Sequence, residues 1–330
     1  MYLIRKIWNP SMFQGHYKRK NYFEGWYYKC IDEEQKCVYS FIPGVAYGKN
    51  GEGKHAFIQV IDGITHKTYY ISFPIEAFWY SMKDFRIRIG NNEFTNHYIS
   101  ISIETPEICI CGKLDFLNRV PYPQKWNAPG IMGPFSFVPR MECYHGVVNI
   151  HHEIQGSLWI DGRENNFSKG YGYIEKDWGR SFPEEWIWMQ CNHFKNPNTS
   201  FMFSIALIPW LHSQFVGFLS FLKIEDHIYT FSTYSGAKIK KLGNHQDKWF
   251  IVIEDNQYQL EVYAKQKIGG YLKAPKNGQM SRMIVESIHS KVKVCLKDKK
   301  TNQVLFLENG TKVGMEIAGD IINWHKKSTR

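Results

Sequence analysis

Short segments in which apolar and polar residues alternate follow one another along almost the whole chain, and no long stretch repeats apolar residues at helical spacing. Residues 54–63 (KHAFIQVIDG) and 146–162 (GVVNIHHEIQGSLWIDG) show the pattern clearly. Alternation with period two places successive side chains on opposite faces of a strand. Turn pairs that are typical of hairpins separate the segments: Asp62-Gly63, Asp161-Gly162 and Asn309-Gly310. The pattern predicts an antiparallel all-β fold, either a barrel or a sandwich.

Residues 200–222 (SFMFSIALIPWLHSQFVGFLSFL) form a run long enough to cross a bilayer as a helix. Pro209, His212 and Gln214 interrupt the middle of the run, and apolar residues alternate with serine on either side. Polar side chains are unfavourable at the centre of a membrane, whereas a proline is well suited to a turn between strands. We therefore expect two buried strands joined by a turn.

Residues 120–141 (VPYPQKWNAPGIMGPFSFVPRM) are rich in proline and glycine, which predicts a long irregular connection rather than a strand pair.

The chain has 330 residues. At roughly 150 residues per domain, this length suggests about two domains.

The formal net charge of +10 favours anionic partners, among them nucleic acid, an anionic membrane surface and acidic small molecules. No recognisable nucleic-acid-binding motif accompanies the charge. A solvated basic surface explains the charge better, so we predict no nucleic-acid partner. Peripheral contact with an anionic membrane is compatible with the same surface.

The seven cysteines show no CxxC pair and no zinc-finger spacing, and the N-terminal stretch MYLIRKIWNPSMFQG lacks the long apolar core of a secretory signal. We expect reduced thiols in a cytoplasmic protein. The chain has no P-loop, no GxGxxG in a βαβ setting and no GxSxG motif, so we also expect no cofactor.

Residues 21–29 (NYFEGWYYK) predict a strand that places an acidic group among aromatic rings. In an extended strand Glu24, Trp26 and Tyr28 share one face. Burial beside the rings would raise the pKa of the Glu24 carboxyl group and suit it to donate a proton. The alternative is that Glu24 lies in solvent at a strand end or forms an ion pair with a lysine, and alternation alone favours this alternative.

Residues 170–194 (GYGYIEKDWGRSFPEEWIWMQCNHF) combine charged residues with tryptophans. If the first half of this block is extended, Tyr173, Glu175 and Asp177 share one face, and Lys176 and Trp178 share the other. Along the second half, indole rings and hydrogen-bonding groups share a face: Trp186, Trp188, Gln190 and Asn192. Such a mixture is typical of a cavity wall that holds a mostly apolar ligand, whereas the opposite face of Ile187, Met189 and Cys191 predicts core.

Residues 144–153 (YHGVVNIHHE) contain three histidines. On a strand His145 and His151 share a face but lie about 20 Å apart at roughly 3.3 Å per residue, and His152 points to the other face. This spacing matches no metal motif, so we predict no metal site. We expect His145 to be a hydrogen-bonding residue of a pocket.

Three blocks of the sequence resemble the tocopherol cyclase family. They are YFEGWYYK near the start, the 170–194 block, and the C-terminal segments GGYLKAP, SRMIVESIHSKVKVCL and ENGTKVGMEIAGDI. Their order and spacing also fit, from about Tyr22 to Asp320. The resemblance implies an all-β fold of two lipocalin-like antiparallel β-barrel or sandwich halves packed side by side, as in carotenoid-hydratase-like proteins. The halves would comprise residues 1–179 and 180–330.

Plant and cyanobacterial members of this family close the chromanol ring of vitamin E precursors. The resemblance therefore implies that an acid protonates a trisubstituted alkene, that a tertiary carbocation forms, and that a phenol oxygen attacks it. Under this hypothesis Glu24 and Glu175 are the proton donors, with Asp177 third because plant members carry Asn at the matching position. The substrate-binding residues would be Trp26, Tyr28, His145, Tyr173, Trp178, Trp186, Trp188, Gln190 and Asn192.

Two functions remain open on the sequence. The first is a cofactor-free cyclase, isomerase or hydratase that acts on a prenylated quinol or another isoprenoid. The second is a lipocalin-like carrier that binds a hydrophobic ligand without chemistry. For the enzyme we expect Glu24, Glu175 and the Trp186–Asn192 face to line one enclosed cavity.

Overall fold

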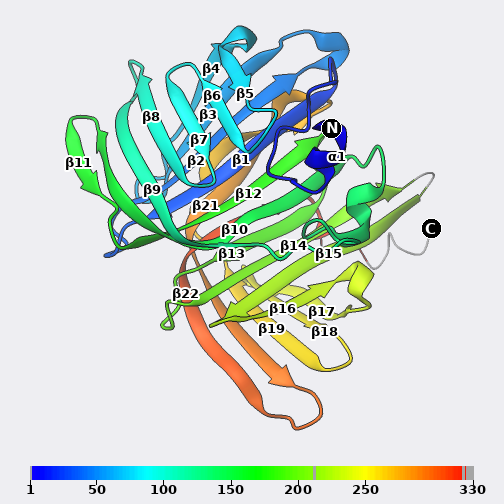
Figure 1. The fold of residues 1–330 in the computed structure, drawn as a ribbon. Coiled ribbons are helices and arrows are strands. Elements are labelled where there is room, and N and C mark those ends of the chain that lie inside the picture. Colours follow the sequence, from blue (N-terminus) through cyan, green and yellow to red (C-terminus); the bar gives the residue numbers. More distant parts are fainter. Residues whose placement is uncertain (1, 211–212, 322–323, 325–330) are drawn as a thin grey trace. The chain divides into compact units, whose positions relative to one another are not determined.

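The computed structural model describes residues 2–210, 213–321 and 324, without the side chains of residues 3 and 4. The chain forms two compact units (Figure 1). Unit 1 comprises Met1–Phe182 and Tyr271–Met283, and unit 2 comprises Pro183–Gly270 and Ile284–Arg330. The expected ranges 1–179 and 180–330 differ from these units mainly at Tyr271–Met283, a segment of the second range that belongs to unit 1.

Unit 1 contains a 12-stranded antiparallel sheet with the order β4-β3-β2-β1-β12-β10-β9-β8-β7-β6-β5, in which β11 pairs with β10. The bounds are β1 (Tyr22–Ile31), β2 (Val38–Tyr47), β3 (His55–Asp62), β4 (Thr68–Pro74), β5 (Phe78–Tyr80), β6 (Arg86–Ile89), β7 (Asn92–Thr95), β8 (Tyr98–Glu104), β9 (Cys109–Pro121), β10 (Cys143–Ile160), β11 (Arg163–Asn166) and β12 (Gly170–Gly179).

A second antiparallel sheet of ten strands has the order β16-β15-β14-β13-β22-β21-β19-β18-β17, in which β20 pairs with β21. The bounds are β13 (Trp186–Cys191), β14 (Thr199–Trp210), β15 (Ser213–Ile224), β16 (His227–Ser232), β17 (Lys238–His245), β18 (Lys248–Glu254), β19 (Tyr258–Lys265), β20 (Gly270–Lys276), β21 (Gln279–Asp298) and β22 (Val304–Ala318).

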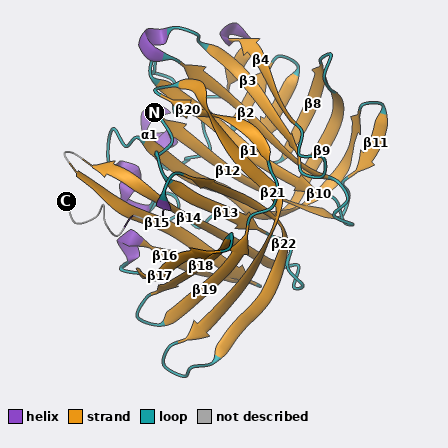
Figure 2. Cartoon of the chain, turned by 180° about the vertical axis from the view of Figure 1, so that it is seen from behind, coloured by secondary structure: helices purple, strands orange, loops and turns teal. Residues whose placement is uncertain are grey.

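The helical elements are short (Figure 2). They are α1 (Tyr2–Ile7), η1 (Lys49–Gly51), η2 (Ile75–Ala77), η3 (Gly133–Phe137) and η4 (Thr233–Ser235). Strands therefore dominate both units, which confirms the predicted all-β fold.

The apolar run 200–222 forms the two strands that its alternation predicts. β14 and β15 pair residue by residue from Thr199↔Ile224 to Trp210↔Ser213, and the connecting residues 211–212 lie outside the described part of the chain. Within the described residues, no helix has the length and apolar character needed to span a bilayer.

One predicted turn is wrong. Asp161-Gly162 joins β10 to β11 with positive φ angles of 48° and 78°, as a tight hairpin requires, but Asn309-Gly310 lies inside β22. A Cβ atom at Gly310 would approach Cys191 Sγ to 2.5 Å, so glycine allows close packing there rather than a turn.

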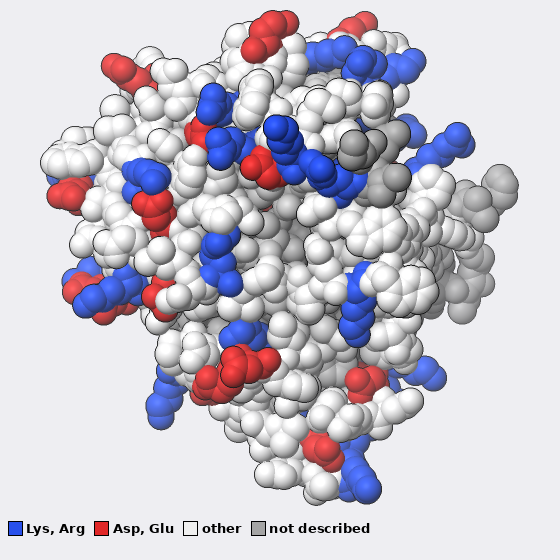
Figure 3. Space-filling model, in the orientation of Figure 1, with Lys and Arg blue, Asp and Glu red and all other residues white. Residues whose placement is uncertain are grey.

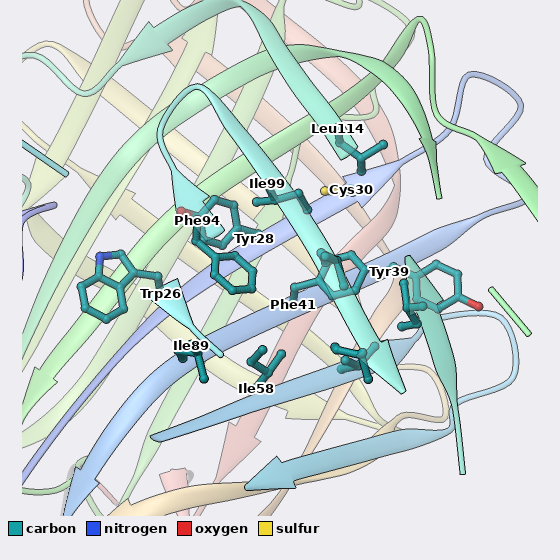
Figure 4. Close-up of a cluster of buried hydrophobic side chains, with 14 of the residues drawn as sticks. Trp26, Tyr28, Cys30, Tyr39, Phe41, Ile58, Ile89, Phe94, Ile99 and Leu114 are labelled. Carbon is teal, nitrogen blue, oxygen red and sulfur yellow. The ribbon is translucent and has the colours of Figure 1, made fainter. Parts of the chain in front are cut away.

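Each unit has its own apolar core. In unit 1 the core includes Trp26, Tyr28 and Cys30 from alternate positions of β1, which point toward the rings and aliphatic side chains of neighbouring strands (Figure 4). In unit 2 it includes Ile187, Met189 and Cys191, which confirms the expected core face of β13. Figure 3 shows Lys and Arg side chains spread over one face of the molecule with acidic side chains among them.

His152 of β10 is a buried histidine in unit 1. The side chain is fully buried, and its ring centroid lies 4.2 Å from that of Phe116. A Cβ atom on Gly172 would come within 2.1 Å of the imidazole, so only glycine leaves room for the ring. Burial lowers the pKa of His152 well below its usual value of 6.5, with smaller effects of His151 and Arg119 in the same direction. The ring is therefore neutral at physiological pH.

We expect acid to destabilise the wild-type protein more than the His152→Phe variant. Below about pH 6.5 the His152 imidazole is protonated in the unfolded chain but stays neutral in the folded protein. This group alone therefore lowers the free energy of unfolding by about 1.4 kcal/mol for each pH unit of acidification. Above about pH 6.5 the difference in pH dependence disappears. Urea unfolding of both proteins between about pH 7.5 and about pH 5 checks this, and parallel pH profiles would contradict it.

Candidate functional site

β12 lies between β1 and β10, and the register of these strands places their side chains on two faces. Asp177 pairs with Gly25 on one side and His145 on the other, and Glu175 pairs with Tyr27 and Val147. Since successive side chains alternate, Glu175 and Asp177 share a face with His145.

Glu24 lies on the opposite face of this sheet. It pairs with Trp178, and the neighbouring Trp26 pairs with Lys176. The expectation that the carboxyl groups of Glu24 and Glu175 meet in one cavity is therefore wrong. The pattern within each strand was interpreted correctly, but a single sequence does not reveal which faces of two paired strands coincide.

Glu24 forms a fully buried ion pair with Lys176, whose Nζ lies 2.5 Å from Oε1. The backbone N–H of Gln14 also donates to the carboxylate, at 2.8 and 3.0 Å, and so does the Tyr22 hydroxyl. Burial lowers the pKa of Lys176 from 10.5 to about 8, while the Glu24 carboxylate opposes this shift. Because its oxygens are already occupied, Glu24 has the contacts of a structural ion pair, the alternative that alternation favoured.

The aromatic residues on this face belong to the packing of unit 1. Trp26 Nε1 donates to Ser11 O at 2.8 Å, and the Tyr28 hydroxyl donates to Thr95 O at 2.8 Å. Trp178 stacks on Tyr144 with centroids 5.4 Å apart and an interplanar angle of 8°. These contacts make Trp26, Tyr28 and Trp178 part of the packing of unit 1, and their role as ligand contacts stays a prediction.

The other face carries a cluster of ionisable side chains around His145, which we call the His145 cluster: His145, Glu175, Asp177 and Tyr173. His145 Nδ1 lies 2.9 Å from Asp177 Oδ1, and Nε2 lies 3.6 Å from Glu175 Oε2. The Tyr173 hydroxyl donates to the same Glu175 oxygen at 2.7 Å. One imidazole thus lies between two carboxyl groups and contacts each through a different nitrogen.

Burial makes these contacts stronger than they would be at a surface. The Glu175 side chain is 5% exposed and that of His145 is 13%, while Asp177 reaches solvent at 24%. Burial, reinforced by Glu175, raises the pKa of the fully buried Tyr173 hydroxyl well above 10, so the hydroxyl stays a hydrogen-bond donor. Burial and then Asp177 raise the pKa of the nearby Cys143 thiol as well.

The cluster also offers one nitrogen and two carboxylate oxygens within 4.8 Å of one another, a set of ligands that could hold a divalent cation. A histidine presents only one ring nitrogen to a metal. Here the carboxyl groups of Asp177 and Glu175 contact opposite nitrogens, and this arrangement favours proton sharing over chelation.

The polar face of β13 lies in unit 2. Trp186, Trp188, Gln190 and Asn192 are all buried, on the face opposite the core residues of the strand. Trp186 Nε1 donates to Glu316 Oε2 at 2.8 Å. These four residues remain predicted ligand contacts.

Comparison with known proteins gives the family. Residues 121–319, more than half of the chain, match the family described as tocopherol cyclase-like. A segment of 38 residues is 47% identical to the probable chloroplastic tocopherol cyclase of Oryza sativa subsp. japonica, and it spans 11% of this chain and 8% of the rice protein.

Two solved structures share the fold. The crystal structure of CghA with Sch210972 is 8% identical, covers 90% of this chain and 89% of its own, and gives a TM-score of 0.54. A putative AttH of Nitrosomonas europaea is 11% identical, and the match covers 92% of this chain and 94% of the AttH chain with a TM-score of 0.51. The residues matched by the family include His145, Glu175 and Asp177, and this chain belongs to the tocopherol cyclase-like family.

Proposed function

We propose that the protein is a cofactor-free enzyme that uses the His145 cluster to protonate the alkene of a prenylated quinol or a related isoprenoid, and so closes a ring. The observation that carries this proposal is the imidazole of His145 placed between Asp177 at 2.9 Å and Glu175 at 3.6 Å. Isomerisation or hydration would begin with the same proton transfer.

The proton count of the cluster supports this chemistry. An ionised Asp177 carboxylate only accepts, which assigns the proton to His145 Nδ1, and in a neutral ring Nε2 would then present a lone pair to the Glu175 carboxylate. Two acceptors facing each other are unfavourable, which favours a proton on Nε2 or on Glu175. This geometry therefore favours one proton shared by the two groups, as a general acid requires.

The proposed steps balance without a redox partner. The proton passes to one alkene carbon, the tertiary carbocation forms at the other, and the phenol oxygen attacks it. The phenolic proton then returns to Glu175 or His145, which restores the cluster. Catalytic hydrogen bonds often shorten once substrate is bound, which is consistent with the 3.6 Å separation from His145 Nε2 to Glu175.

The tocopherol cyclase-like family and the 38-residue match to the rice protein support this substrate class. The structure of CghA with Sch210972 supports the fold alone. Because the rice match is short, the substrate itself is part of the proposal.

The test is to incubate the purified protein with a panel of prenylated quinols and to separate the products by mass and retention time. The proposal expects a product of unchanged mass and altered retention. A ligand that binds in native mass spectrometry and returns unaltered would instead establish the carrier.

Dialysis against a chelator should leave turnover unchanged, and loss of activity that a divalent cation restores would overturn the proton-sharing assignment.

A further inference from the structure

We propose that the Glu24–Lys176 ion pair and the segment Pro10–Gln14, here called the strap, position β12 so that Glu175 and Asp177 meet His145. Glu24 and Lys176 would be positioning residues, because they lie on the face of the sheet opposite the cluster. This inference rests on the proposed function only where it concerns catalysis.

Buried side chains of β1 and β12 hold the backbone of the strap. Lys176 Nζ donates to Pro10 O at 2.8 Å and to Met12 O at 2.5 Å. Trp26 Nε1 donates to Ser11 O at 2.8 Å. The ammonium of Lys176 also lies 4.8 Å from the ring centroid of Trp26, within the range of a cation–π interaction. Lys176 therefore links the strap to the middle of β12.

At the other end of the strap, the backbone N–H of Gln14 donates to both oxygens of Glu24. Met12 and Phe13 are buried, and the ring centroid of Phe13 lies 4.4 Å from that of Tyr80. The strap is thus a packed element of unit 1 (Figure 1, in blue near α1).

The strap also packs against the strand that carries His145. A Cβ atom on Gly146, the neighbour of His145, would lie 3.4 Å from Pro10 and 3.2 Å from Trp178. Since Gly146 pairs with Lys176, the strap supports both strands of the cluster at the same level.

The backbone ladder between β10 and β12 is regular at the level of the cluster and is interrupted directly after the Val147–Glu175 pair, whereas β1 pairs with β12 without a shift. The pairing of β10 with β12 is regular from Cys143 to Val147 and then shifts before Asn149. A β-bulge of this kind changes the direction of the side chains beside it. The strap contacts add to the ladder at a place where a shift of about 1 Å would break the hydrogen bond between His145 and Asp177.

Nitrogen-15 NMR of the histidine rings in the full chain tests the proposal without substrate. In the wild type we expect a slowly exchanging Nδ1–H resonance for His145, assigned by its loss in His145→Gln. In Lys176→Met the resonance should disappear or exchange at least about 10-fold faster, because β12 is no longer held at hydrogen-bonding distance.

Two further variants separate positioning from stability. Ile99→Ala removes core volume in β8 and leaves the Glu24–Lys176 pair and the strap hydrogen bonds in place, so it should keep the resonance although it destabilises unit 1. Glu24→Gln/Lys176→Met removes both charges and should regain stability without regaining the resonance. A native His145 signal in the folded double variant would overturn the proposal. Loss of the signal with no cyclase activity in the wild type would overturn the proposed function alone.

Discussion

Replacing Glu175 with glutamine lowers the turnover number for the cyclised substrate by about 100- to 10,000-fold, the range typical of general acid–base groups. The amide keeps the shape of the carboxyl group, and it can still accept the hydrogen bond from Tyr173. It cannot take up and release the proton that Glu175 shares with His145. Steady-state kinetics measures the loss, and the dissociation constant of the substrate should change little.

The matched control for this prediction is Glu164→Gln on β11, an exposed residue outside the His145 cluster. This variant should retain the wild-type rate. His145→Gln should lose activity to a similar extent as Glu175→Gln, and the double variant should lose little more, because the two groups act as one unit. Wild-type rates in both single variants would contradict the role of the cluster.

Replacing Lys176 with methionine should reduce the free energy of unfolding by about 3–5 kcal/mol, the usual cost of leaving a buried charge without its partner. The Glu24 carboxylate would keep its bonds from Tyr22 and Gln14 but would lose the ammonium at 2.5 Å. The strap would also lose two hydrogen bonds to its carbonyl groups. Urea unfolding followed by tryptophan fluorescence measures this change.

The double variant Glu24→Gln/Lys176→Met should recover most of that loss, because no unpaired charge stays buried. The wild type, Glu24→Gln, Lys176→Met and the double variant form a double-mutant cycle. The interaction energy from their four free energies of unfolding measures the coupling between Glu24 and Lys176. If Lys176→Met unfolds at the wild-type urea concentration, the pair does not stabilise unit 1 as the buried geometry requires.

Alternation within each segment was sufficient to predict the strands and which residues of one strand share a face. It separated Glu175 and Asp177 from Lys176 and Trp178, and it separated the core residues of β13 from Trp186 and Gln190. These are local properties, and the period of a strand determines them.

The pairing of distant strands could not be predicted from the same pattern. β1 pairs with β12 across about half of the chain, and only this pairing shows that Lys176 is the partner of Glu24. The same pairing places Glu24 and Glu175 on opposite faces. His145 was expected to be a ligand contact, but its registry with Asp177 makes it the centre of the ionisable cluster.

The structural role of a glycine that follows Asn or Asp also depends on distant contacts. At Gly162 it serves a hairpin with positive φ, whereas at Gly310 it makes room for Cys191 inside a long strand. The Asn-Gly pair alone does not distinguish these uses. The segment Tyr271–Met283 joins unit 1 through tertiary contacts, which a single boundary placed between two halves of the sequence does not reveal.

The most direct test of proton donation to carbon is to run the reaction in D₂O and to determine the mass of the recovered product. Proton transfer to the alkene predicts one non-exchangeable deuterium in each cyclised molecule, and it predicts that Glu175→Gln forms this labelled product far more slowly. Recovery of bound but unlabelled and uncyclised ligand from the wild-type protein would contradict the account and identify a carrier.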